Sequence, residues 1–360
     1  MVNEVKTKKK RIFYLDELRA LAIILVILAH VTRKFCENYT VGDANWIASA
    51  PLISIAVLGV PIFLMISGVL LLNREYELGD FLKRRFSRIL IPFIFWAALL
   101  PIHKMIFINQ PATIQNYIQL FLVGQYWFVY MLIGVYLALP ILNTFIQKYK
   151  LKGVEYFLIM WFIVLILNTF NKYPFASFRL EYFAGFLGYL PLGYYLANKD
   201  FKISDKYLII IGLLMCIIGI YINWHSILVK WPITGKISYY GYETIVTVLG
   251  ASGLFIAVKS YVSMCDKNIK SIPGKIHSFI EHSFIGKAIL SVSICSYGMF
   301  LIHYFWQFIF VWMGRNMFPI FQRDPTFALP IMLIVISFLS WLVTYVLSKI
   351  PYLKEISGAH

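Results

Sequence analysis

Apolar segments of about 20 residues, the length that crosses the hydrocarbon core of a bilayer, recur along almost the whole chain. They lie at 12–32, 51–72, 89–109, 118–141, 153–171, 180–198, 207–224, 239–258, 288–312 and 326–348. Gly124, Gly134 and Pro140 interrupt the segment at 118–141, so a re-entrant piece is the alternative to a single span there. Charged residues make up only 14% of the 360 residues, whereas about a quarter of a soluble domain is charged. The sequence predicts an all-α integral membrane protein with about ten transmembrane helices and one membrane domain.

The basic residues predict the orientation of these helices. If the N-terminus is cytoplasmic, most of the 33 lysine and arginine residues fall on cytoplasmic segments, as the positive-inside rule requires. The prediction is a basic N-terminal tail at 1–11, a membrane domain at 12–348 and a C-terminal tail at 349–360, with both tails in the cytoplasm. This distribution explains the net charge of +16 without nucleic acid as a partner.

The first apolar segment carries charges that a membrane helix normally excludes. In LDELRALAIILVILAH, Asp16, Glu17, Arg19 and His30 accompany an uninterrupted apolar run that is too short to span a bilayer alone. Arg19 and His30 are 11 residues apart, which places them within about 20° of one helix face and about 16 Å apart along the axis. Asp16 precedes Arg19 by three residues and is close enough to pair with it.

Ionisable side chains inside a membrane are functional candidates, because each is costly unless it is paired or faces water. The alternative for the first helix is a boundary ion pair between Asp16 and Arg19, with His30 in the outer headgroup region. The stretch FLKRRFSRILIPF adds Arg84, Arg85 and Arg88 at helical spacing. Arginine suits bidentate phosphate binding, although a positive-inside flank against anionic lipid explains the same cluster.

Two more stretches combine polar residues with apolar spans. In GVPIFLMISG, Pro61 and the pair Ser67 and Gly68 interrupt a span, which is typical of backbone that lines a cavity or of a packing kink. In SYGMFLIH, Ser296 and His303 are seven residues apart and share a helix face. Hydrogen bonds between packed helices are the alternative for this pair.

Two acidic residues lie near predicted external span ends. Glu181 and Glu243 fall on the side where His30 is expected, and the three suggest a polar vestibule, or else interfacial residues in water. The four cysteines are scattered and form no zinc-ligand spacing, and the chain has no Walker loop, HExxH or GxSxG motif. The sequence therefore predicts no metal site, no bound cofactor and no ATP hydrolysis.

Taken together, these stretches resemble the acyltransferase 3 family of multipass membrane acyltransferases, in its standalone form without an SGNH-hydrolase-like domain. The resemblance covers essentially the whole chain. It rests on DELRALAIILVILAH, FLMISG, RRFSRILIP, QYWFVYMLIGVYLALP and SYGMFLIH, in the order of the family. It implies transfer of an acyl group, often acetyl and sometimes succinyl, from cytoplasmic acyl-CoA to a hydroxyl of a cell-envelope saccharide or lipid-linked sugar, in the cell membrane.

The resemblance also implies roles for individual residues. His30 takes the place of the family's catalytic histidine, Arg19 that of its partner arginine, and Asp16 lies where the family often has an acid. Arg85 and Arg88 match an arginine motif near the donor.

Three further residues extend this assignment. Arg84 completes the donor cluster, and Tyr136 matches a frequent family tyrosine. Ser67, Tyr136 or backbone amides at the Gly68 break would stabilise the thioester oxyanion.

A competing interpretation is an exporter or flippase of a polysaccharide or lipid-linked sugar, with the intramembrane charges along a translocation path. Consumption of acyl-CoA without net movement of unmodified glycan would favour the enzyme. The acceptor, the acyl group, the oligomeric state and any separate extracytoplasmic protein that completes the transfer stay open.

Overall fold

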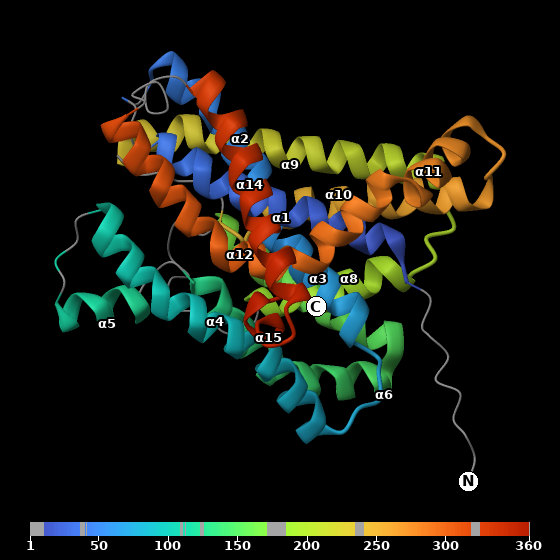
Figure 1. Ribbon diagram of the computed structural model, residues 1–360. Helices are drawn as coiled ribbons and strands as arrows, with labels where there is room; N and C mark the ends of the chain where they lie inside the picture. Colours follow the sequence, from blue (N-terminus) through green and yellow to red (C-terminus); the bar gives the residue numbers. More distant parts are fainter. Residues whose placement is uncertain are drawn as a thin grey trace, which may run out of the picture.

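The computed structural model describes residues 11–36, 40, 42–108, 111, 113–122, 126–170, 185–234, 241–317 and 325–359. Within these ranges every regular element is a helix and no strand occurs (Figure 1). The helices are α1 (Phe13–Cys36), α2 (Ala44–Ala56), α3 (Gly59–Leu71), α4 (Leu78–Ile108), α5 (Ile114–Leu122), α6 (Trp127–Phe170), η2 (Phe186–Gly188), α8 (Tyr189–Asn198), α9 (Asp205–Thr234), α10 (Ile245–Lys267), α11 (Ile272–His282), α12 (Phe284–Asn316), α14 (Pro325–Lys349) and α15 (Lys354–Ser357). The predicted all-α class is confirmed.

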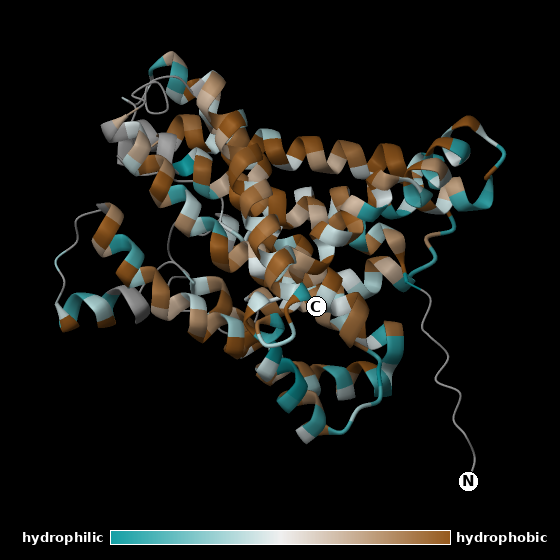
Figure 2. Ribbon diagram, in the orientation of Figure 1, coloured by the Kyte–Doolittle hydropathy of each residue, from teal (hydrophilic) through white to brown (hydrophobic). Residues whose placement is uncertain are grey.

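Seven helices within the described ranges are long and apolar enough to cross a membrane. They are 44–71, 78–107, 127–167, 205–229, 245–267, 284–314 and 326–349. The outward faces of α9 and α14 are strongly apolar (Figure 2), with Ile217 61% and Ile334 67% exposed. Because water would not stabilise such surfaces, they are suited to lipid, and the chain is a multipass membrane protein.

The structure corrects one predicted span and one predicted break within a span. The span predicted at 118–141 is divided, because α5 ends at Leu122 and packs beside α4, and a separate helix begins at Trp127. The interruption predicted at Pro61 and Gly68 lies earlier, at Val57 and Leu58 between α2 and α3. Pro61 is tolerated near the start of α3, where its missing N–H has no intrahelical partner.

The long helix α6 contains a sharp bend. Lys150 has φ 52° and ψ −146°, which is outside the helical region, so two helices meet there. Figure 2 shows hydrophilic residues around this bend and at the start of α4. The bend separates the predicted spans at 118–141 and 153–171 into two arms joined by a polar turn.

Glycines bring α3 and α8 into backbone contact. A Cβ atom on Gly68 would lie 1.9 Å from the carbonyl oxygen of Leu190, and one on Gly193 would lie 2.1 Å from that of Met65. Gly68 is therefore a packing glycine inside a continuous helix, and the predicted break with free backbone amides at Gly68 is wrong. The contact fixes α3, which carries Ser67.

The segment after α14 folds back onto the helices. Ser357 is buried, and the indole N–H of Trp96 on α4 donates to the Ile356 carbonyl at 2.9 Å. Gly358 has φ +72° and lies against Gly298 of α12, where neither residue has room for a side chain. The segment 354–359, predicted as a tail, thus packs between α4 and α12 (Figure 1).

Candidate functional site

The larger of two adjoining cavities has a volume of about 310 Å³ and lies between α1, α3, α4, α6 and α12. Its polar and charged lining comprises Arg19, Ser67, Arg85, Arg88, Tyr136, Ser293, Ser296 and Tyr297. No carboxylate occurs among the described residues that line it. Three guanidinium groups in a confined space favour an anionic ligand. Each guanidinium can donate two parallel hydrogen bonds to two oxygens of one phosphate group.

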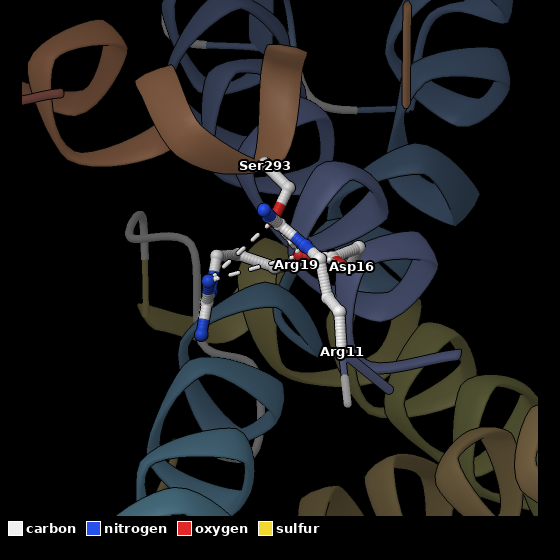
Figure 3. Close-up of polar contacts among 4 residues, drawn as sticks. All are labelled: Arg11, Asp16, Arg19 and Ser293. Carbon is white, nitrogen blue, oxygen red and sulfur yellow. Dashed lines mark hydrogen bonds and ion pairs between the residues drawn. The ribbon is translucent and has the colours of Figure 1, made fainter. Parts of the chain in front are cut away.

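A polar network at the start of α1 fixes the first of these arginines (Figure 3). The Asp16 carboxylate accepts two hydrogen bonds from Arg11, at 2.6 and 2.9 Å, and one from the Ser293 hydroxyl of α12 at 2.6 Å. Arg19 lies 4.0 Å from Asp16 and 3.5 Å from the Ser293 hydroxyl. The predicted proximity of Asp16 and Arg19 is present, but Arg11 is the closer partner.

This network explains how Asp16 is accommodated. Its side chain is 5% exposed, and a buried carboxylate is costly unless it is paired and hydrogen-bonded. Arg11 and Ser293 satisfy its oxygens, while Arg19 keeps one side toward the larger cavity. Asp16 therefore connects α1 to α12 and restricts where Arg19 points.

The predicted arginine cluster divides into two groups. Arg85 and Arg88 line the larger cavity together with Arg19. Arg84 does not line it, because its guanidinium reaches Asp80 at 3.3 Å, and both of those side chains are more than 60% exposed. Arg85 also lies over the Phe81 ring at 5.9 Å, which limits its mobility.

Three predicted hydroxyl-bearing residues also line the larger cavity, namely Ser67, Tyr136 and Ser296. The Ser67 hydroxyl donates to the Phe63 carbonyl at 2.9 Å, so its lone pairs are what it presents to the cavity. Tyr136 is 8% exposed. The Tyr136 hydroxyl is hydrogen-bonded to the Ser67 side chain, so the arginines are better placed than either hydroxyl to donate hydrogen bonds to a ligand in this cavity.

The smaller cavity, of about 110 Å³, contains His30. Its wall comprises Val26, Ala29, His30, Arg33, Ile53, Ala56, Val57, Val60, Trp127, Phe128, Tyr242 and Phe300. Apart from His30 and Arg33 the wall is formed by apolar and aromatic side chains. Such surroundings strengthen any hydrogen bond that the imidazole makes, because the local dielectric is low.

The His30 imidazole is held by residues of α12. The Tyr304 hydroxyl lies 3.0 Å from its Nε2, and the Gln307 side-chain amide donates to the His30 carbonyl at 2.8 Å. His303 lies beside it, with ring centroids 5.1 Å apart, and is buried. His30 and His303, which were predicted as separate candidates, therefore lie side by side, although Tyr304 is the residue within hydrogen-bonding distance of His30.

Helices α1 and α12 run parallel, and polar side chains join them at both ends. Ser293 meets Asp16 near the start of α1, and Tyr304 meets His30 fourteen residues further along α1 and eleven residues further along α12. Ser293, Tyr304 and Gln307 were not predicted as site residues from the sequence. Their spacing was the available signal, since residues 293, 296, 300, 304 and 307 follow one helical face.

Of the two acidic residues predicted near His30, the structure describes only Glu243. Glu181 lies outside the described residues. Glu243 precedes α10 and adjoins Tyr242, whose side chain lines the smaller cavity. Among the described residues, no group of three or more His, Cys, Asp or Glu side chains is arranged to hold a metal ion.

Comparison with known families connects this geometry to an activity. A family model described as an acyltransferase domain matches residues 12–348. The chain belongs to this acyltransferase family. The match covers all three arginines of the larger cavity and the histidine of the smaller one, and no SGNH domain is matched. No significant match occurs among curated proteins or among solved structures.

Proposed function

We propose that this family member transfers a short acyl group from cytoplasmic acyl-CoA to a hydroxyl of an extracytoplasmic acceptor. The observation that carries the proposal is the position of Arg19 and His30 in two adjoining cavities along one helix. The 11 residues between them correspond to about 16 Å of helix. An acyl-CoA needs cationic groups for its phosphates and a base at the distant thioester, and α1 carries one of each.

The larger cavity is the proposed donor site. Arg85 and Arg88 would bind the phosphates of CoA by charge-assisted hydrogen bonds. Arg19 would lie beside the pantetheine arm, further into the membrane domain. The absence of carboxylates from its described lining avoids repulsion of the polyanionic donor. With the nucleotide held at this end, CoA itself does not need to cross the membrane.

His30 is the proposed general base. Its imidazole takes the proton of the acceptor hydroxyl as the oxygen attacks the thioester carbonyl, and the C–S bond then breaks. The histidinium returns the proton to the departing CoA thiolate, so the products are an O-acyl ester and CoA–SH. Tyr304 orients the imidazole through its hydroxyl, at 3.0 Å from Nε2.

The proposed topology has ten spans with both termini in the cytoplasm. In that order α1 and α12 are the first and ninth spans, and their parallel course supports this. The end of α1 that carries Asp16 and Arg19 is then cytoplasmic, where acyl-CoA occurs. The end that carries His30 is extracytoplasmic, which suits a cell-envelope saccharide or lipid-linked sugar outside the plasma membrane.

Radiolabelled acetyl-CoA tests the proposal. The purified full-length chain in lipid nanodiscs is incubated with [¹⁴C]acetyl-CoA and an envelope extract from cells that lack it. We expect CoA release and ester-linked label in the saccharide or lipid fraction, which mild alkali removes. Movement of unmodified glycan across proteoliposomes without acyl-CoA consumption would contradict the proposal and favour an exporter.

A further inference from the structure

The two cavities share four side chains from four different helices. Val26 of α1, Val60 of α3, Phe128 of α6 and Phe300 of α12 line both the larger and the smaller cavity. All four are apolar, and each is less than a tenth exposed. They form the boundary between the space that contains the arginines and the space that contains His30.

The boundary is closed by aromatic packing. The rings of Phe128 and Phe300 meet edge to face, with centroids 5.1 Å apart. Phe63, which lines the larger cavity, packs against Phe128, and the Phe300 ring lies 5.8 Å from the ring of His303, the neighbour of His30. These neighbours hold the two phenylalanines in place between the two cavities.

The register along α1 places this boundary between the two functional groups. Val26 follows Arg19 by seven residues and precedes His30 by four, so all three lie near one helix face. A thioester that is delivered from the arginine side must pass Val26 to reach the imidazole. Charged phosphates cannot follow it, because the passage offers no polar partner among the four side chains.

We propose that Val26, Val60, Phe128 and Phe300 form an apolar gate that selects short acyl groups and keeps water from the thioester. This inference rests on the proposed function. The gate admits the slender thioester end of acyl-CoA by small displacements of the two rings. The cavity beyond it, about 110 Å³ in volume, then limits the acyl chain, because that space must also hold the acceptor hydroxyl.

The gate also has a consequence for side reactions. A narrow apolar constriction excludes water from the connection between two cavities. Hydrolysis of the thioester requires a water molecule beside His30 when no acceptor is bound. A closed gate suppresses this reaction, whereas a widened gate admits water and lets His30 deprotonate it.

Variants of one helix test the gate. Phe128→Ala widens it, and Leu139→Ala is the matched control, because Leu139 is a buried side chain of the same helix that lines neither cavity. The full-length chain in nanodiscs is assayed for binding of acetyl-, butyryl- and octanoyl-CoA. Release of CoA without acceptor is measured in the same samples with a thiol reagent. Val60→Ala is a second, smaller widening for the case that Phe128→Ala does not fold.

We expect Phe128→Ala to raise the ratio of octanoyl-CoA to acetyl-CoA affinity at least tenfold, and Val60→Ala to raise it less. We expect acceptor-free CoA release to rise at least tenfold in Phe128→Ala and to disappear when His30→Ala is added. Leu139→Ala should keep both values within about twofold of the unmodified chain.

If folded gate variants keep the original length preference and hydrolysis rate, while the unmodified chain binds acyl-CoA, the gate is refuted and the proposed function stands. If the unmodified chain binds no acyl-CoA of any length, the proposed function fails and the gate fails with it.

Discussion

The two cavities along α1 differ in ways that separate binding from chemistry. The larger, about 310 Å³, has three arginines and several hydroxyl groups, whereas the smaller, about 110 Å³, surrounds His30 with aromatic and aliphatic side chains and has Arg33 as the one arginine of its described lining. Cations in a polar space suit a polyanionic donor, and an imidazole in apolar surroundings suits proton transfer. Substitutions in the larger cavity should therefore change affinity, and those in the smaller should change turnover.

The largest expected effect belongs to His30. His30→Ala should lower the rate of acyl transfer by about 10² to 10⁴-fold, because a positioned general base contributes that much. Acyl-CoA affinity should stay within about twofold. His225→Ala, an exposed histidine of α9, is the control and should change neither quantity. A His30→Ala protein with undiminished turnover would contradict the assignment of the chemical step to the smaller cavity.

The next largest effect is expected for Arg85. Arg85→Ala should weaken acetyl-CoA binding by about tenfold to a hundredfold, since a hydrogen bond to a charged group contributes about 1.5–3 kcal/mol. The control is Arg84→Ala, which removes the neighbouring guanidinium that pairs with Asp80 outside the cavity. Titration calorimetry in nanodiscs measures both. Equal losses in the two variants would indicate a general charge effect at the membrane surface and not a donor site.

A smaller effect is expected for Tyr304. Tyr304→Phe keeps the ring but removes the hydroxyl at 3.0 Å from His30. The value of kcat should fall by about twofold to tenfold with KM for acyl-CoA unchanged, and the pH profile of kcat should move. Tyr126→Phe is the control, because that hydroxyl donates to the Leu301 carbonyl instead. A change in KM for acyl-CoA with kcat unchanged would reject the positioning role of Tyr304. Equal losses of kcat in Tyr304→Phe and Tyr126→Phe would reject it as well.

The smallest effect on activity is expected for Ser293. Ser293→Ala removes one of the hydrogen bonds to Asp16, while Arg11 still pairs with the carboxylate. Acetyl-CoA affinity should change by less than about threefold, and the free energy of unfolding should fall by about 1 kcal/mol. Thermal unfolding in nanodiscs compares it with Ser348→Ala on the exposed end of α14. A donor-affinity loss as large as that of Arg85→Ala would show that Ser293 binds the donor itself and does not act through Asp16.

The sequence predicted the fold class and most helices, because long apolar runs in a membrane protein can only form helices or closed barrels. The predicted span at 288–312 lies within α12, and that at 326–348 within α14. The split between α5 and α6 was indicated only by Gly124, Gly134 and Pro140 within the predicted span, since hydropathy does not distinguish a short helix beside α4 from the start of a span. The backbone contact of Gly68 with Leu190 depends on tertiary packing, which a local pattern does not contain.

The candidate site was predictable only along single helices. The spacing of Arg19 and His30 fixed their relation on α1, because helical geometry alone determines it. Spacing could not separate Arg84 from Arg85, since each is one turn from Arg88. Only the packing of α4 turns Arg85 toward the cavity and leaves Arg84 with Asp80.

Residues on α12 were missed for a related reason. The intramembrane charge rule selects His303 but gives no weight to the adjacent Tyr304, because tyrosine is common in membrane proteins. Which of the two reaches His30 depends on the rotation of α12 against α1. That rotation is fixed by contacts between helices that are far apart in the sequence.

The central claim is that acyl groups pass from donor to acceptor across the membrane through the two cavities. Sealed inside-out and right-side-out membrane vesicles from cells that produce the protein test it most directly, with external [¹⁴C]acetyl-CoA as the label. Inside-out vesicles should accumulate ester-linked label on lumenal acceptors, and this should be lost with Arg85→Ala at low donor concentration and with His30→Ala at any concentration. Label that enters right-side-out vesicles equally well, or that remains on the donor side, would contradict it.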